Sequence, residues 1–350
     1  MSFFAELQRR NVLRAWVSLA IAACCAIALA QQTAVAPDAE FRAAMAWAFP
    51  LNPPPDPHAP LPDMHAPLRV PDSTRSYTLA DYDHMFGAPD WFPKDHPPMP
   101  GIVAHGRKPA WACAYCHLPN GQGRPENAPL AGLPAAYVVE QVRAFRSGER
   151  VSGRPETARF MPAEARNVTD ADLKTAAEYF SSLNFKPWTH VIETATVPTT
   201  HIAHWMLVTN ADGAHEPIGE RIVETSTDIA RTELRDTRFG FVAYVPPGSI
   251  AAGRKIAAQG MGTAAACEAC HGRGLLGADM PGIGIAPPLA GRSPTYIVRE
   301  LILFRLGGRA NAQAALMRQE ASDLTLQDMI AVAAYAASLA PQVELTGRTP

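Results

Sequence analysis

The stretch WACAYCHLPN, residues 111–120, decides the fold of this chain. It places Cys113 and Cys116 three positions apart, with His117 directly after the second cysteine. The same arrangement returns in CEACHGRG, residues 267–274. In this second copy the three residues are Cys267, Cys270 and His271. One explanation must therefore cover two sites that lie far apart in the sequence.

A Cys-x-x-Cys pair serves three chemistries: a redox dithiol of the thioredoxin kind, half of a zinc site, or, with histidine next, attachment of a c-type haem. Zinc would need two further ligands at each pair, or both pairs in one site. A redox dithiol requires βαβ surroundings. Spacing alone leaves all three open, but haem is the ligand that uses both sulfurs and the adjacent histidine.

Composition sets the limits for the whole chain. Its 350 residues, 47% of them hydrophobic, are enough for two ordinary domains. The net charge is −2 and no run of Lys or Arg resembles a nucleic-acid footprint, so a nucleic-acid partner has no support. Many of the 33 prolines fall in FPLNPPPDPHAPLPDMHAPLRVP, residues 49–71, which predicts an extended arm without a helix.

The N-terminus has the pattern of a secretory signal. Three arginines within residues 1–14 precede an apolar run, residues 15–30, that ends in Ala-Leu-Ala. This pattern predicts export to the periplasm. Extending the run back to Val12 gives 19 residues, so an uncleaved anchor in the inner membrane stays open. Cleavage would leave four cysteines, all of them in the two motifs, and none for a structural disulfide.

An internal repeat extends well beyond the cysteines. APLAGLPAAYVVEQVRAFRSGER, from residue 128, parallels APPLAGRSPTYIVRELILFRLGGR, from residue 286. The alignment pairs Tyr137 with Tyr296, Phe145 with Phe304 and Gly148 with Gly307. Self-similarity over such a length predicts that the two halves share a fold.

Each copy then reaches a methionine in the same register. Met161 lies 8 residues before Thr169 and Met317 lies 8 residues before Thr325. Each threonine is followed three positions later by aspartate, as in a capping box, so a helix is predicted to begin at each. Further helix boundaries are indicated by Pro134 and Pro294 in a first turn and by Gly148 and Gly307 at an end.

With these motifs the chain resembles the tandem di-haem cytochromes of the class I cytochrome c fold, over residues 101–185 and 250–340. The resemblance implies two covalently bound haems c. For the first it implies thioethers from Cys113 and Cys116, with His117 and Met161 as iron ligands. For the second it implies Cys267, Cys270, His271 and Met317 in the same roles. It also implies that a proline carbonyl orients each imidazole, and Pro129 and Pro288 match that position.

The implied ligand set points to electron transfer. Histidine and a thioether fill both axial positions, and the thioether favours ferrous iron and raises the reduction potential. The expected function is a periplasmic electron carrier between a donor dehydrogenase or membrane complex and a terminal acceptor, with no catalytic residues. Two alternatives stay open: a di-haem enzyme of the cytochrome c peroxidase type, and an electron-transfer subunit of a larger dehydrogenase. In every case the expected partners are redox proteins.

The predicted fold class is mainly α: two cytochrome c-like helical domains, a small β-prone connector and a Pro-rich arm. The connector contains the β-prone runs HWMLV, ERIVE and GFVAYV, which predict a hairpin or three strands. Gly106 stands 7 residues before Cys113, whereas Gly253 stands 14 before Cys267, so the first domain is expected to have a shortened N-terminal helix. The arm is expected to cover the surface that this helix leaves open. The predicted segments are a signal peptide or anchor (1–30), arm (31–100), first domain (101–185), connector (186–249), second domain (250–340) and tail (341–350).

Overall fold

The computed structural model describes residues 38–153, 160–186 and 188–341. The predicted signal peptide or anchor and nearly all of the predicted tail lie outside the described residues. The chain divides into two compact units, residues 1–42 and 43–350, and the second contains both motifs. In the described part of the chain, no helix is long and apolar enough to cross a bilayer.

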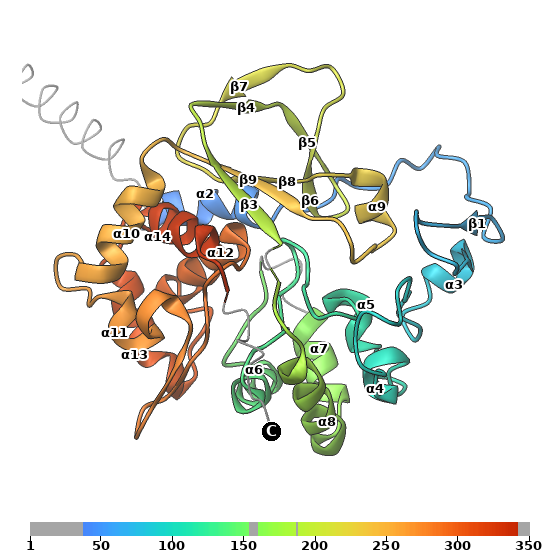
Figure 1. The fold of residues 1–350 in the computed structure, drawn as a ribbon, viewed down its shortest axis with the longest axis horizontal. Helices are drawn as coiled ribbons and strands as arrows, with labels where there is room; N and C mark the ends of the chain where they lie inside the picture. The colour runs from blue at the N-terminus through green and yellow to red at the C-terminus, as the bar shows by residue number, and fades with distance from the viewer. Residues whose placement is uncertain (1–37, 154–159, 187, 342–350) are drawn as a thin grey trace, which may run out of the picture. The chain divides into compact units, whose positions relative to one another are not determined.

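Both repeats fold into helices in the same order, in two groups that Figure 1 shows in teal to green and in orange to red. The first group comprises α4 (Gly101–Ala104), α5 (Cys113–His117), α6 (Ala135–Ser147), α7 (Phe160–Asn167) and α8 (Asp170–Ser182). The second comprises α10 (Ser249–Gln259), α11 (Cys267–His271), α12 (Pro294–Arg305), α13 (Ala315–Ser322) and α14 (Leu326–Ser338). A short 3₁₀ turn follows α11 (Arg273–Leu275) and another precedes α13 (Ala312–Ala314). Two helical repeats are therefore present, and several small sheets accompany them.

The helix starts predicted at Thr169 and Thr325 are confirmed, since α8 and α14 begin one residue after them. The Thr325 hydroxyl accepts from the backbone N–H of Asp328, and the Asp328 carboxylate accepts from the backbone N–H of Thr325, which completes a capping box on α14. Thr169 accepts from the backbone N–H of Asp172 in the same way. The Asp172 carboxylate instead pairs with Arg107 at 2.8 Å.

Removing the cap of α14 is expected to cost about 1 kcal/mol, because Thr325→Ala leaves a first-turn N–H without its partner. Urea unfolding followed by circular dichroism measures the loss. Thr175→Ala is the matched control, because Thr175 lies in the middle of α8 with its side chain exposed to solvent. This variant is expected to change stability little. Equal losses for the two variants would contradict the capping role.

The expected difference between the N-terminal helices is confirmed. In the first repeat α4 has 4 residues, whereas α10 has 11 and packs along α14. Gly253 lies at this helix crossing, and a Cβ atom there would overlap the carbonyl oxygen of Ala331. The two backbones therefore approach closely only because position 253 carries no side chain.

The connector is larger than the predicted hairpin or three strands. It contains β3 (Thr189–Glu193), β4 (Thr196–Pro198), β5 (Thr200–Ala203), β6 (Met206–Thr209), β7 (His215–Pro217), β8 (Val223–Ser226), α9 (Ile229–Glu233) and β9 (Phe241–Val245). Five of these strands form a mixed sheet in the order β3-β9-β8-β6-β5, and β4 pairs with β7. Because β3 pairs in parallel with the distant β9, turn signals between neighbouring runs do not reveal the sheet.

Residues 49–71 of the arm contain no helix, as predicted. Within the arm lie α2 (Ala39–Ala48), β1 (Pro67–Leu68), β2 (Tyr77–Thr78) and α3 (Leu79–Tyr82). The arm docks on the loop after α9. The Trp91 indole donates to the Leu234 carbonyl at 2.6 Å, and Arg238 forms an ion pair with Asp95 at 2.6 Å.

Candidate functional site

Helices α5 and α11 present the two Cys-x-x-Cys-His motifs with their histidines in the same hydrogen-bonded state. His117 Nδ1 lies 2.8 Å from the Ala128 carbonyl oxygen, and His271 Nδ1 lies 2.9 Å from that of Pro287. A carbonyl oxygen only accepts, so Nδ1 carries the proton and Nε2 keeps a lone pair for a metal. Burial lowers the pKa of both histidines, which favours the neutral form.

The predicted roles of Pro129 and Pro288 are wrong by one residue. The carbonyls that orient the imidazoles belong to the residues before these prolines. The carbonyls of Pro129 and Pro288 point instead to Arg292, whose Nη1 and Nε donate to them at 2.8 Å each. Arg292 therefore ties together the equivalent turns of the two repeats.

The second repeat gathers its predicted site residues in one cavity of about 250 Å³. Cys267, Cys270, His271 and Met317 all line it. Most other wall residues are apolar, including Ile256, Leu275, Leu301 and Phe304. A flat apolar ring with two thioether links and two axial iron ligands fits such walls and this donor set. Met280 lies in the same wall, so one further methionine shares this cavity.

Burial keeps the thiols of Cys113, Cys116 and Cys267 protonated. It raises the pKa of Cys113 to about 12 and that of Cys267 to about 11. The pKa of Cys116 is raised for the same reason. Such thiols are poor nucleophiles in exchange reactions, which disfavours a redox dithiol.

In each repeat a glutamate fixes the methionine helix to the motif. Glu164 in α7 accepts from the backbone N–H of Trp111 at 2.7 Å, and Glu320 in α13 accepts from that of Ala265 at 2.7 Å. Each glutamate stands three residues after the methionine, and each N–H stands two residues before the first cysteine. Met161 therefore belongs to a helix held against its motif in the same register as Met317. Sequence reasoning missed both glutamates, although their equal spacing in the two repeats is a signal for them.

A buried polar network joins the two repeats around Glu300. Its carboxylate pairs with Arg150 at 2.8 Å and with Arg309 at 2.9 Å. The Gln141 side-chain oxygen accepts from the same two arginines at 2.8 and 2.6 Å. Gln141 and Glu300 are equivalent in the repeat, as are the two arginines, each two residues after the paired glycine. The network thus has approximate two-fold symmetry and lies beside the second cavity, which Gln141, Glu300 and Arg309 also line.

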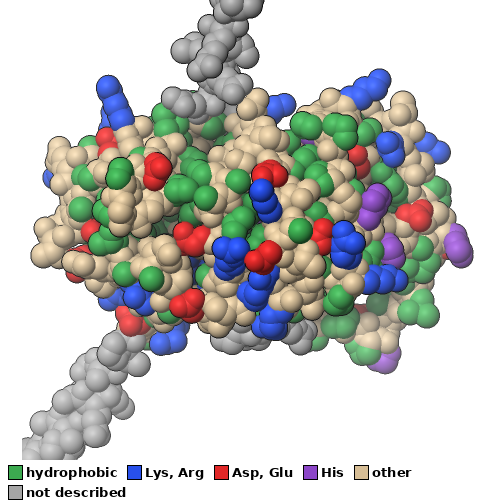
Figure 2. All heavy atoms as spheres, turned by 90° about the horizontal axis from the view of Figure 1, so that it is seen from below, with side chains coloured by type: hydrophobic (Ala, Val, Ile, Leu, Met, Phe, Trp, Pro, Cys, Tyr) green, Lys and Arg blue, Asp and Glu red, His purple; other side chains and the backbone are tan. Residues whose placement is uncertain are grey.

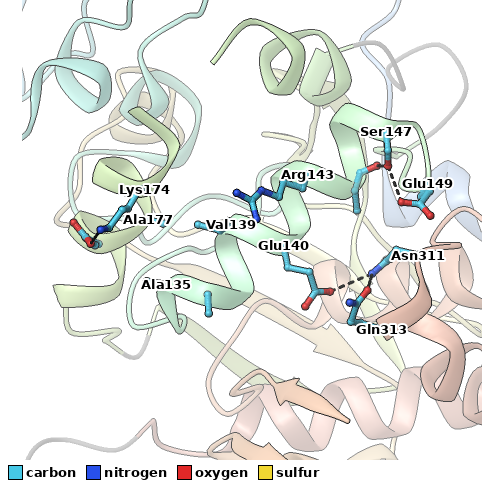
Figure 3. Close-up of a pocket in the computed structure, with 13 residues that line it drawn as sticks. Ala135, Val139, Glu140, Arg143, Ser147, Glu149, Lys174, Ala177, Asn311 and Gln313 are labelled. Atoms are coloured by element: carbon cyan, nitrogen blue, oxygen red, sulfur yellow. Dashed lines mark hydrogen bonds and ion pairs between the residues drawn. The ribbon is translucent and has the colours of Figure 1, made fainter. Parts of the chain in front are cut away.

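A groove of about 640 Å³, which shares Glu140, Asn311 and Gln313 with the wall of the second cavity, is shown in Figure 3. Its walls come from α6 and α8 and from Asn311, which donates to Glu140 at 3.1 Å. Its described lining residues include no cysteine, histidine or methionine, so the groove has none of the donors of the motif sites. On the face shown in Figure 2, Lys and Arg side chains are interspersed with Asp and Glu.

Comparisons with known proteins agree with this geometry. No protein-family model matches the chain. Cytochrome c4 of Azotobacter vinelandii is 26% identical over 241 residues, which cover 67% of this chain and 88% of that protein. Cytochrome c-554(548) of Halomonas halodenitrificans is 37% identical over 83 residues, 23% of this chain and 96% of that protein. A thiosulfate dehydrogenase electron acceptor of Thiomonas intermedia is 26% identical over 233 residues, 65% of this chain and 79% of that protein. With its duplicated motif, the chain belongs to the tandem di-haem c-type cytochromes, which carry electrons on two covalently bound haems.

Proposed function

We propose that this cytochrome shuttles single electrons in the periplasm between a donor dehydrogenase or membrane complex and a terminal acceptor. In this proposal Cys113 and Cys116 hold the first haem, with His117 and Met161 as axial ligands. Cys267 and Cys270 hold the second, with His271 and Met317. The observation that carries the proposal is the second cavity, where two thiols, an imidazole and a thioether meet within apolar walls.

The chain's residues favour electron exchange over substrate chemistry. The bound haem supplies a one-electron iron couple. Each imidazole is held by a backbone carbonyl, so its Nε2 has a fixed direction. In this proposal Met317 would be the second iron ligand in the second site, and Met161 would be its counterpart in the first. Two protein ligands on each iron would leave no position at the metal for a substrate.

The relatives support the proposed class of donor. One of them is named as the electron acceptor of a thiosulfate dehydrogenase, which supports a dehydrogenase as the donor. The secretory pattern of residues 1–30 supports the periplasmic location. A cleaved signal peptide and a retained anchor would both place the protein there. A peroxidase-type enzyme would need one site to lose its distal ligand, and the equal register of Met161 and Met317 speaks against that difference.

Methionine ligation is tested by the weak far-red absorption band of oxidised haem, which reports a sulfur-to-iron bond. The protein is produced in a host that matures c-type haem, and covalent haems per chain are counted. We expect two haems, a band reduced by half in Met161→Ala and in Met317→Ala, and no band in the double variant.

Met280→Ala is the matched control, because this methionine lines the second cavity without being a proposed ligand, and its band is expected to stay complete. A wild-type band of only half intensity would mean that one site is open or bound by another residue. That result would favour the peroxidase-type alternative, and a chain without covalent haem would refute the proposal.

A further inference from the structure

The turns that follow the two motif histidines differ in charge. In each repeat a glycine six residues after the histidine donates its N–H to the carbonyl of that histidine, at 3.1 Å for Gly123 and 2.7 Å for Gly277. The next residue is Arg124 in the first repeat and Ala278 in the second. Ala278 opens a hairpin of two short strands, β10 (Ala278–Met280) and β11 (Gly284–Ala286). The first turn therefore carries a guanidinium where the second carries a methyl group.

A second arginine reaches the first motif from the connector. The Arg235 guanidinium lies 4.1 Å from the ring centre of Tyr115, the residue before Cys116 in α5. It also lies 4.7 Å from the ring centre of Tyr82 in the arm, so two aromatic rings hold it. Burial raises the pKa of Cys116, and the positive charges of Arg235 and Arg124 oppose this rise. Both guanidiniums therefore lie close enough to act on the first motif.

Arg124 and Arg235 are anchored to one carbonyl group. The Thr232 carbonyl in α9 accepts from Arg124 Nη1 at 3.1 Å and from the backbone N–H of Arg235 at 3.0 Å. Arg124 also pairs with Glu126 at 2.5 Å, which compensates its charge in part. Arg235 Nη1 is buried and, within the described residues, accepts no such compensation because it has no hydrogen-bond partner there. Arg235 is therefore the positive charge that the connector adds to the first site.

The long helices of the repeats carry opposite charges at equivalent positions. Three residues after the paired tyrosines, α6 carries Glu140 and α12 carries Arg299. Arg299 is 3% exposed and donates to the carbonyls of Pro125 and Glu126 at 3.0 and 3.3 Å, in the turn after the first motif. Glu140 lines the second cavity and accepts from Asn311 of the second repeat (Figure 3). Each helix thus reaches the opposite repeat, with a positive charge at the first site and a negative charge at the second.

The motifs themselves differ in the same direction. The residue after the first cysteine is Ala114 in α5 and Glu268 in α11. Burial raises the pKa of Cys267, and the negative charges of Glu320 and Glu268 raise it further. Glu320 has an equivalent in Glu164, so these two charges cancel in a comparison of the sites. Glu268 remains as a negative charge of the second motif alone.

The arginines at the interface of the repeats are shared by the two sites. Arg292 donates at 2.8 Å to the carbonyls of Pro129 and Pro288, which belong to equivalent turns. The two arginines that pair with Glu300 come from equivalent positions, one in each repeat. The difference in charge between the sites therefore comes from the connector, from the turn after the first histidine, from the second motif and from the exchanged pair on α6 and α12.

We infer that these charges make the first haem the stronger electron acceptor, so that an electron passes within the chain from the second haem to the first. This inference rests on the proposed function. Arg235 and Arg299 favour ferrous iron in the first site, whereas Glu140 and Glu268 disfavour it in the second. In the transfer, ferrous iron in the second site becomes ferric and ferric iron in the first site becomes ferrous. No bond is made or broken.

The sign follows from the charge of the iron site. Reduction removes one positive charge, so a nearby positive charge stabilises the reduced state and a nearby negative charge destabilises it. Arg299 is buried and Arg235 is held over two rings, and charges in such places are screened little by salt. The difference between the haems is therefore expected to persist at physiological ionic strength.

The test measures the two reduction potentials separately in the complete chain. The far-red band vanishes on reduction, and it reports only the first haem in Met317→Ala and only the second in Met161→Ala. Each reporter chain is titrated with dithionite in the presence of redox mediators. We expect the band of the first haem to vanish at the higher potential.

Arg235→Gln is then added to each reporter chain. At a fixed potential we expect the ratio of reduced to oxidised first haem to fall on the order of tenfold, the size expected for one buried charge near the iron. The second haem is expected to keep its ratio. Arg235→Lys keeps the charge and is expected to keep both ratios. Arg238→Gln is the matched control, because it removes a positive charge from the same loop, where this exposed residue pairs with Asp95.

Glu140→Gln is the converse variant and keeps an oxygen that accepts from Asn311. We expect the ratio of reduced to oxidised second haem to rise about threefold, a smaller effect because Glu140 is partly exposed to solvent. The first haem is expected to keep its ratio. Glu178→Gln is the matched control, since Glu178 lines the same groove without lining the second cavity.

Several results would overturn the inference. One is a second haem that is reduced at the same or a higher potential than the first. Another is an equal shift of both haems in Arg235→Gln, or no shift in either Arg235→Gln or Glu140→Gln. An equal loss in Arg235→Lys would assign the effect to packing instead of charge. A reporter chain without covalent haem or without a far-red band would count against the proposed function instead.

Discussion

The Gly253→Val variant is expected to lose about 3 kcal/mol of the free energy of unfolding, with the loss confined to the second repeat. A side chain at this position would overlap the Ala331 carbonyl oxygen and reach within 2.8 Å of the Tyr335 Cβ atom. Both obstacles belong to α14, which is buried and cannot yield as a flexible side chain would. Helices α10 and α14 would have to separate, and the cavity wall supplied by Ile256 and Val332 would shift with them.

Gly101→Ala is the matched control for this variant. Gly101 lies in α4 of the first repeat, and a Cβ atom there would meet nothing within 4 Å. Alanine also favours a helix over glycine, so this variant is expected to be neutral or slightly more stable. Urea unfolding monitored by circular dichroism and by the far-red band compares the two. Gly253→Val should lose half of the band at a lower urea concentration than wild type, and identical curves for both variants would refute the close-contact argument.

Local and repeated features of the chain were predictable from the sequence. The N-caps at Thr169 and Thr325 depend on residues three positions apart, so they are visible without tertiary information. The short α4 follows from the position of Gly106. A single motif does not single out a methionine. Comparison of the two copies does, because it places Met161 and Met317 in the same register.

Features that depend on distant contacts were not predictable. The carbonyl that orients each imidazole was misplaced by one residue, because a spacing does not state which way a carbonyl points. The connector sheet was underestimated because β3 finds its partner in β9. Trp205 and Arg235 of the connector contact Phe160 and Tyr115 of the first repeat, and nothing local in the sequence signals these contacts.

The second large effect is expected for Glu300→Gln, which should cost about 3 to 5 kcal/mol because it leaves two buried arginines without a carboxylate. Arg150 and Arg309 are each about 95% buried and come from different repeats. In the wild type they share one negative charge, that of Glu300. Without it their mutual repulsion acts across the interface of the repeats. Urea unfolding is expected to change from one transition to two, as the repeats lose their coupling.

The reciprocal change provides the control. Gln141 occupies the equivalent position in the first repeat and already accepts from both arginines. Gln141→Glu/Glu300→Gln therefore moves the single carboxylate to the other side of the network while keeping its two partners. This double variant is expected to recover most of the lost stability. If it is as unstable as Glu300→Gln alone, or if the single variant loses less than about 1 kcal/mol, the charge argument is wrong.

The same network predicts how the interface responds to acid. Burial raises the pKa of Glu300, but the positive charges of Arg150 and Arg309 outweigh burial and hold the pKa below its ordinary value. A carboxyl group with a lowered folded pKa stabilises the native state fully above its unfolded pKa, about 4.3. That contribution is lost as the pH falls through the folded pKa. Wild-type stability should therefore fall steeply below about pH 4, whereas Glu300→Gln, which has no proton to bind there, should show a shallower loss over the same range. Equal slopes would place the acid sensitivity in other carboxylates and remove Glu300 from the coupling of the repeats.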